Sequence, residues 1–159
     1  MAKDTSHDLD QVAAAVRRQK LASKDIALLR EKIAALDEAG IEHRFVKAAM
    51  RNLKVAGTQL KDIQQRQENE PFDEAAFEQL PEHLRKRILE RLDNIAKRMR
   101  DVSDQSKSPE YSDPAFRCLR DYEICRREGR SPALWCQLAM VVCLLRSVLS
   151  LPVKLPGSK

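Results

Sequence analysis

The four cysteines carry the most reactive side chains in the chain, and their spacing is symmetric. They occupy positions 118, 125, 136 and 143, in the pattern C-x6-C-x10-C-x6-C. Cysteines seven residues apart lie on one face of an α-helix, about two turns from each other. The pattern therefore predicts two cysteine-bearing helices, one on each side of a central turn.

Helix start and stop signals around the cysteines predict a helical hairpin. Asp113-Pro114 and Ser131-Pro132 each place an N-cap residue before a proline, which is typical of the first turn of a helix. Gly129 is expected to end the first of these helices. Because the connection is only two or three residues long, the two helices must be antiparallel neighbours.

An antiparallel hairpin places each cysteine opposite one on the other helix. The midpoint of Cys118 and Cys143 coincides with that of Cys125 and Cys136, and it falls in the Gly129–Ser131 turn. The facing pairs can be two disulfides, buried thiols or metal ligands. A single four-cysteine site is disfavoured, because the two cysteines of each helix are about 10.5 Å apart along its axis, whereas zinc needs every sulfur about 2.3 Å away. We predict no metal.

The redox state of these cysteines depends on the cellular compartment. The N-terminus lacks the apolar segment of a secretory signal, which predicts a cytoplasmic protein; disulfides would instead indicate an oxidising compartment. The hairpin broadly resembles the twin-cysteine helical hairpins of the mitochondrial intermembrane space, which also enter without a secretory signal. Those families have C-x9-C or C-x3-C pairs, whereas this chain has C-x6-C, so we do not transfer the family assignment.

The rest of the sequence is typical of amphipathic helices. Apolar residues make up 43% and charged residues 33% of the chain, with only four glycines. Apolar side chains at three- and four-residue spacing predict one helix between Ser6 and Gly40, a second with a coiled-coil seam from Val46 to Ile63, and a third from Pro81 to Val102. A short helical piece is expected over 73–80. No segment alternates like a strand, so we predict no sheet.

These elements predict an all-α protein of antiparallel helical hairpins, which form a small bundle or coiled coil followed by a C-terminal two-helix hairpin. Residues 1–102 would form the bundle, and residues 103–112 a polar linker. The cysteine-bearing hairpin would cover residues 113–151, and residues 152–159 a flexible tail.

Two surfaces are candidate binding sites. One is the apolar face of the last helix, which is too wide for a single partner helix to cover; its central residues are Trp135, Leu138, Val142 and Leu145. It must pack into the bundle, another protein or a membrane surface. The other is the basic face of the third helix, which is formed by Arg85, Lys86, Arg87, Lys97, Arg98 and Arg100.

No pattern in the sequence indicates catalysis. His7, His43 and His83 have no metal-ligand spacing, and no glycine-rich loop could hold a phosphate. We therefore predict a non-enzymatic helical scaffold or adaptor without cofactors, which binds a protein partner or itself as a homo-oligomer. One alternative is electrostatic binding of nucleic acid or an anionic membrane surface, as the net charge of +5 allows. Another is a thiol-redox or metal-handling role.

Overall fold

The computed structural model describes residues 5–37, 39, 44–66, 71–105, 114–129 and 131–149. Within these ranges the chain forms a small all-α bundle, as predicted. Its helices are α1 (Thr5–Arg17), α2 (Ser23–Ala34), α3 (Arg44–Arg66), α4 (Glu74–Glu78), α5 (Glu82–Gln105), α6 (Pro114–Glu128) and α7 (Ala133–Leu149). Two short strands, β1 (Lys20–Leu21) and β2 (Phe72–Asp73), pair in antiparallel register.

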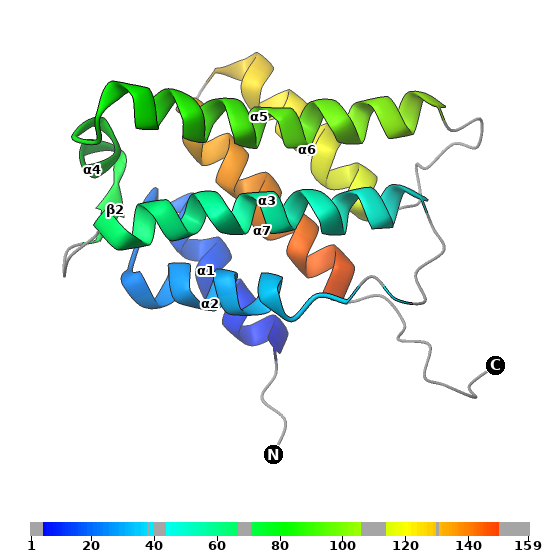
Figure 1. Cartoon of the computed structure of the whole chain (residues 1–159), viewed down its shortest axis with the longest axis horizontal. Coiled ribbons are helices and arrows are strands. Elements are labelled where there is room, and N and C mark those ends of the chain that lie inside the picture. Colours follow the sequence, from blue (N-terminus) through cyan, green and yellow to red (C-terminus); the bar gives the residue numbers. More distant parts are fainter. Residues whose placement is uncertain are drawn as a thin grey trace.

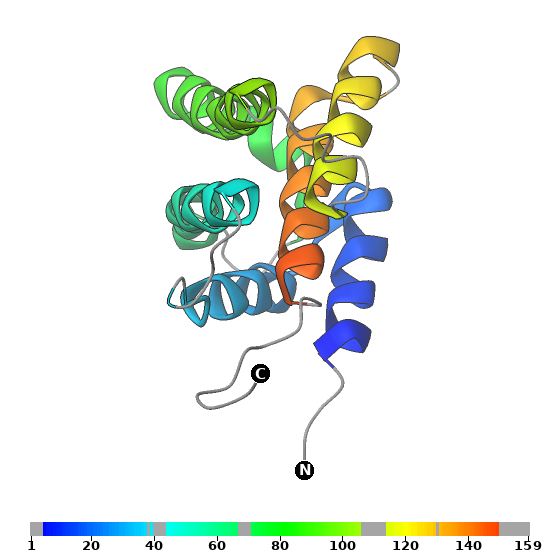
Figure 2. The same ribbon diagram turned by 90° about the vertical axis from the view of Figure 1, so that its right-hand side faces the viewer.

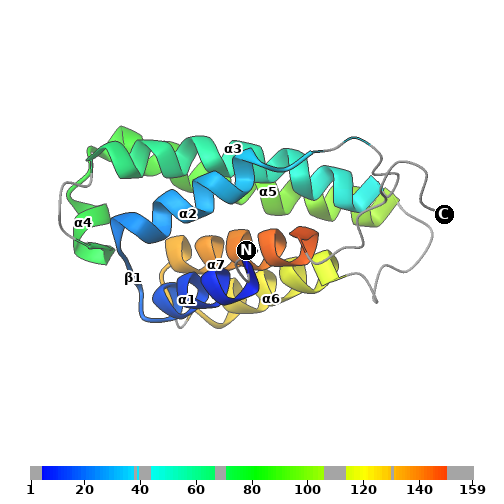
Figure 3. The same ribbon diagram turned by 90° about the horizontal axis from the view of Figure 1, so that it is seen from below.

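The helices are arranged in two layers. One layer contains α2, α3 and α5, with the long helices α3 and α5 side by side (Figure 1). The other contains α1, α7 and α6, and the two layers are seen most clearly when α3 and α5 are viewed end-on (Figure 2). Seen from below, α7 lies between the first layer and the helices α1 and α6 (Figure 3).

Helix α7 is buried on nearly every side, because its sequence is apolar around most of its circumference. It packs against α1, α3, α5 and α6, and Leu138, Val141, Leu144 and Leu145 have no measurable solvent exposure. A helix that is apolar on all sides is stable in water only when other elements cover it. Here the chain itself provides that cover.

The apolar face predicted as a partner-binding site is therefore part of the core. Trp135 and Val142 are only 2% and 3% exposed, and Leu138 and Leu145 are completely buried. The prediction of a partner surface fails for a physical reason: both layers converge on α7, a tertiary arrangement that the helical pattern alone does not specify. The indole Nε1 of Trp135 also donates a hydrogen bond to Glu74 of α4, at 3.1 Å.

The single helix predicted between Ser6 and Gly40 is wrong. Helix α1 ends at Arg17, and Gln19 adopts a positive φ of 58°, the left-handed conformation that commonly follows a helix. The chain then forms β1, in which the buried Leu21 pairs with Phe72 of β2. This pair also corrects the prediction of no sheet. Strands of two residues are too short to produce a detectable alternation in the sequence.

Helix α3 uses its predicted seam to contact several helices. The seam residues are all buried: Val46, Ala49, Leu53, Ala56, Leu60 and Ile63. They belong to a helix that packs against α2, α5 and α7, as in a bundle. On α3, Gly57 allows α2 to approach closely, since an added Cβ would lie 3.2 Å from a methyl carbon of Ile33.

The C-terminal hairpin and the N-terminal helices share one hydrophobic core, which extends from Leu9 to Val148. Helix α5 continues to Gln105, three residues into the predicted linker. The Asp113 cap, the rest of that linker and the predicted tail at 152–159 lie outside the described residues, as does Gly40.

Replacing Trp135 with alanine should lower the free energy of unfolding by about 3–5 kcal/mol, because it leaves a large cavity in the core. Urea denaturation measures the change. Leu149→Ala is the matched control, because Leu149 is 38% exposed, and it should alter stability by less than about 0.5 kcal/mol. Equal effects of the two substitutions would contradict the burial of Trp135.

Candidate functional site

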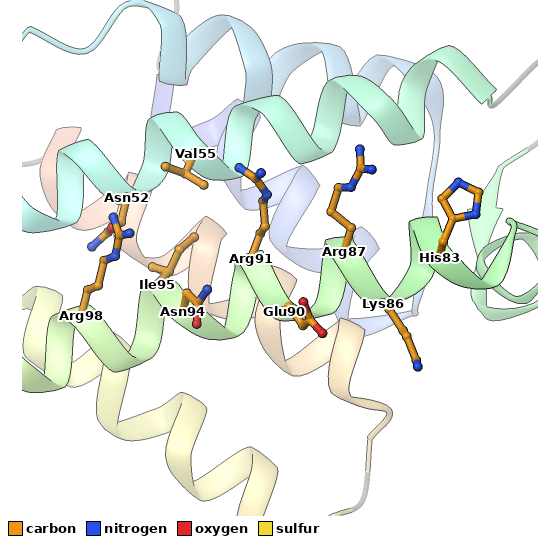
Figure 4. Close-up of a pocket in the computed structure, with 10 residues that line it drawn as sticks. All are labelled: Asn52, Val55, His83, Lys86, Arg87, Glu90, Arg91, Asn94, Ile95 and Arg98. Atoms are coloured by element: carbon orange, nitrogen blue, oxygen red, sulfur yellow. The ribbon is translucent and has the colours of Figure 1, made fainter.

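A groove of about 650 Å³ lies between α3 and α5 (Figure 4). Its volume is within the range of about 300–1,000 Å³ that is typical of ligand sites. Helix α3 contributes one wall. The lining residues are Asn52 and Val55 from α3, and His83, Lys86, Arg87, Glu90, Arg91, Asn94, Ile95 and Arg98 from α5.

The hydrophobic stripe of α5 determines which of its residues line the groove. That stripe is buried in the core and consists of Leu84, Ile88, Leu92, Ile95 and Met99. Residues 83, 87, 91, 94 and 98 follow at the same three- and four-residue spacing, so they form a second stripe beside the first. Arg87, Arg91 and Arg98 extend from α5 toward α3, whereas Lys86 extends away from it (Figure 4).

Half of the predicted basic face of α5 has structural partners. The guanidinium Nε of Arg85 donates to the carbonyl of Leu80 at 3.1 Å. Lys97 lies 3.8 Å from the carboxylate of Asp93. Arg100 pairs with Glu123 of α6 through two hydrogen bonds, and it lies over the ring of a phenylalanine on the same helix. These three cations thus contact the residue that precedes α5 by two positions, α5 itself and α6.

The other half of the basic face lines the groove. Within the described residues, the side chains of Lys86, Arg87 and Arg98 make no hydrogen bond or ion pair with the rest of the chain, and all three are exposed. The side chain of Arg91 is also exposed and makes no hydrogen bond or ion pair with any described residue. Glu90 is the single carboxylate among the lining residues, so positive charge in the groove exceeds negative charge.

Part of this site is absent from the surface predicted from the sequence. The predicted basic face omits Arg91, and the sequence assigns no binding role to His83. The recurrence of positions 83, 87, 91, 94 and 98 was the signal that could have revealed both. The α3 wall, Asn52 and Val55, could not be identified, because its position depends on how α3 packs against α5.

The hairpin cysteines pair as the sequence predicts. Cys118 and Cys143 are joined by a disulfide with their Cα atoms 5.6 Å apart, and Cys125 and Cys136 by another with a separation of 5.9 Å. Both separations are within the usual range of about 4.4–6.8 Å. Among the described residues, no group of histidine, cysteine and carboxylate side chains could hold a metal ion. The cysteines therefore hold α6 against α7.

A polar cluster connects α6 to α5 on the side of the hairpin. The hydroxyl of Tyr122 donates to Asp93 at 2.8 Å, and Arg126 donates to the same hydroxyl at 3.0 Å. Burial raises the pKa of Tyr122 above its ordinary value of 10.0, and the bond to Asp93 and its negative charge raise it further, against the opposing effects of Arg126 and Gln137. Tyr122 is therefore a neutral, structural hydrogen-bond donor near neutral pH.

Comparisons with family models, curated proteins and solved structures find no match to this chain. None of the helices in the described ranges is both long and apolar enough to cross a lipid bilayer. The geometry and charge of the groove are therefore the features that bear on function.

Removing either disulfide should lower the free energy of unfolding, because the unfolded chain then gains conformational entropy. The bridges close loops with sequence separations of 25 and 11 residues, for which loop-closure entropy gives about 3.5 and about 2.8 kcal/mol. Denaturation of Cys118→Ala/Cys143→Ala and Cys125→Ala/Cys136→Ala measures both values. Intact mass before and after reduction is the control, and it should rise by four hydrogen atoms. Thiols that react with an alkylating agent before reduction would contradict the disulfides.

Ionisation of Tyr122 should occur above pH 10 in the folded protein and should reduce stability there. Because the pKa of Tyr122 is raised in the folded protein, the stability that the neutral phenol contributes is fully present below about pH 10. It is lost as the pH rises through the folded-state pKa. Tyrosinate absorbance of the Tyr111→Phe variant isolates Tyr122. Stability of the Tyr122→Phe variant should depend less on pH in this window. A titration midpoint at or below 10 would contradict the buried hydrogen bond.

Proposed function

We propose that this chain is a non-catalytic helical binding protein that holds an anionic partner in the groove between α3 and α5. The main support is the set of exposed cations there. Lys86, Arg87, Arg91 and Arg98 make no ion pair with any described residue, whereas Lys97 and Arg100 of the same helix pair with carboxylates.

Arginine is well suited to such a role. Its planar guanidinium can form two parallel hydrogen bonds with a carboxylate or phosphate. Arg87, Arg91 and Arg98 extend into one concave site (Figure 4), so one extended anion can contact all three. The net charge of +5 also increases the rate at which an anionic partner encounters the chain.

This proposal keeps a role in protein–protein interaction but moves the binding surface from α7 to α5. The apolar residues of α7 are occupied inside the core. Leu149 is the one large apolar side chain that is exposed in the part of the chain that the structure describes. An apolar self-assembly surface therefore has little support, and charge is the better basis for recognition.

The disulfides support an oxidising compartment as the place where the protein acts. Disulfides persist in such compartments and are rare where glutathione and thioredoxin keep thiols reduced. Both bridges lie in the hairpin, and α6 of that hairpin contacts α5 through Tyr122 and Glu123. Oxidation would thus support the helix that carries the groove cations.

Charge reversal in the groove should abolish anion binding. The variant Arg87→Glu/Arg91→Glu/Arg98→Glu should weaken binding of a labelled oligoglutamate, measured by fluorescence anisotropy, by more than about a hundredfold. Wild-type affinity should also fall as salt rises.

The matched control is Arg117→Glu/Arg120→Glu/Arg127→Glu, which changes net charge equally on the exposed face of α6. It should keep most of the wild-type affinity. Circular dichroism verifies that both variants fold. An equal loss of affinity for oligoglutamate in the two variants would refute a localised site. An affinity that does not change with ionic strength would refute it as well.

A further inference from the structure

We infer that the occupant of the α3–α5 groove is an acidic amphipathic α-helix of another protein, which lies along the groove as a third helix. This inference depends on the proposed function, because it specifies the partner for the same site. It follows from the shape of the groove, its mixed lining and the spacing of its arginines.

The groove has the shape that a helix needs. Helices α3 and α5 have 23 and 24 residues and lie side by side (Figure 1), so each is about 35 Å long. Two such helices leave a straight furrow between them, into which a third helix can pack with its axis about 8–10 Å from theirs. Recognition of a helix in a groove is a common mode of peptide binding.

The lining combines apolar, amide and charged groups in the way that protein interfaces do. Val55 is half-buried between the two helices, and Ile95 lies beneath the surface at 1% exposure. Asn52 and Asn94 supply amide groups that can donate and accept hydrogen bonds. A partner that is apolar at the centre and charged at the edges complements this lining better than a uniform polyanion does.

The arginines are spaced to match carboxylates on one face of a helix. Arg87 and Arg91 are separated by about 6 Å along the α5 axis, and Arg91 and Arg98 by about 10.5 Å. Glutamates at i, i+4 and i+11 of a parallel partner helix have the same separations. In an antiparallel partner, the matching positions are i, i+7 and i+11. A helix with glutamates at i, i+4, i+7 and i+11 therefore serves either direction.

Nucleic acid fits the groove less well. The lining contains no phenylalanine, tyrosine or tryptophan, and the imidazole of His83 is the single ring among its residues on which a base could stack. Glu90 repels a backbone that carries a negative charge on every unit, whereas a protein helix can place a neutral or basic residue there. Duplex DNA is commonly contacted by a helix that protrudes into its major groove, and this site is a concave furrow between two helices.

The test uses designed peptides with the full-length oxidised protein. One labelled peptide of about five helical turns carries glutamates at i, i+4, i+7 and i+11, a leucine between them, and alanine and glutamine elsewhere. A second peptide has the same composition, with the glutamates distributed around the helix. A labelled oligothymidylate and phosphatidylserine vesicles are the other probes. Anisotropy or co-sedimentation measures binding of each probe to wild type, the groove variant and the α6 control variant.

The inference predicts that the patterned peptide binds at least about tenfold more tightly than the distributed peptide. This preference should be lost in Arg87→Glu/Arg91→Glu/Arg98→Glu and kept in the α6 control. Equal affinity for both peptides would overturn the helical partner but leave the anion-binding groove. Tighter binding of the oligothymidylate or the vesicles than of the patterned peptide would also overturn the inference of a helical partner. If the groove variant and the α6 control bind every probe equally, both the inference and the proposed function fail.

Discussion

The fold depends on the need to cover α7. Its side chains are apolar around most of the helix, and a single neighbour would leave much of that surface in water. Four helices provide most of this cover, with α6 held against α7 by two disulfides and α1, α3 and α5 packed around the rest. Gln137, the buried polar residue of α7, uses its amide to donate to the carbonyl of Leu89 on α5. This bond adds a directional contact to a core that is largely apolar.

The burial of α7 also explains where the binding groove lies. Since α3 and α5 turn their hydrophobic stripes toward the core, the residues beside those stripes border the furrow on the outer surface. The cations of α5 consequently have two roles. Arg100 and Lys97 interact with carboxylates of α6 and α5, whereas Arg87 and Arg91 extend over the furrow toward α3 (Figure 4). One amphipathic helix thereby contributes to the core, to contacts between helices and to a charged surface.

Local patterns predicted much of this structure. The shared midpoint of the cysteines gave the pairing of Cys118 with Cys143 and of Cys125 with Cys136, because an antiparallel hairpin has only one register around a short turn. Proline and glycine positions located α5, α6 and α7. Predictions failed where tertiary contacts decide. The reversal at Gln19 has no glycine or proline, and the burial of Trp135 and the α3 wall of the groove require knowledge of which helices meet.

The central position of α7 has a consequence for how the protein is made. The helix that completes the core comes last in chain order, after the six other helices of the described residues. During synthesis, α1–α5 emerge before α7, so the parts of their hydrophobic stripes that pack against α7 are exposed at first, a state that favours aggregation or binding by chaperones. The two layers can reach their final arrangement only after α7 emerges, so a chain that ends before the last helix would have an incomplete core.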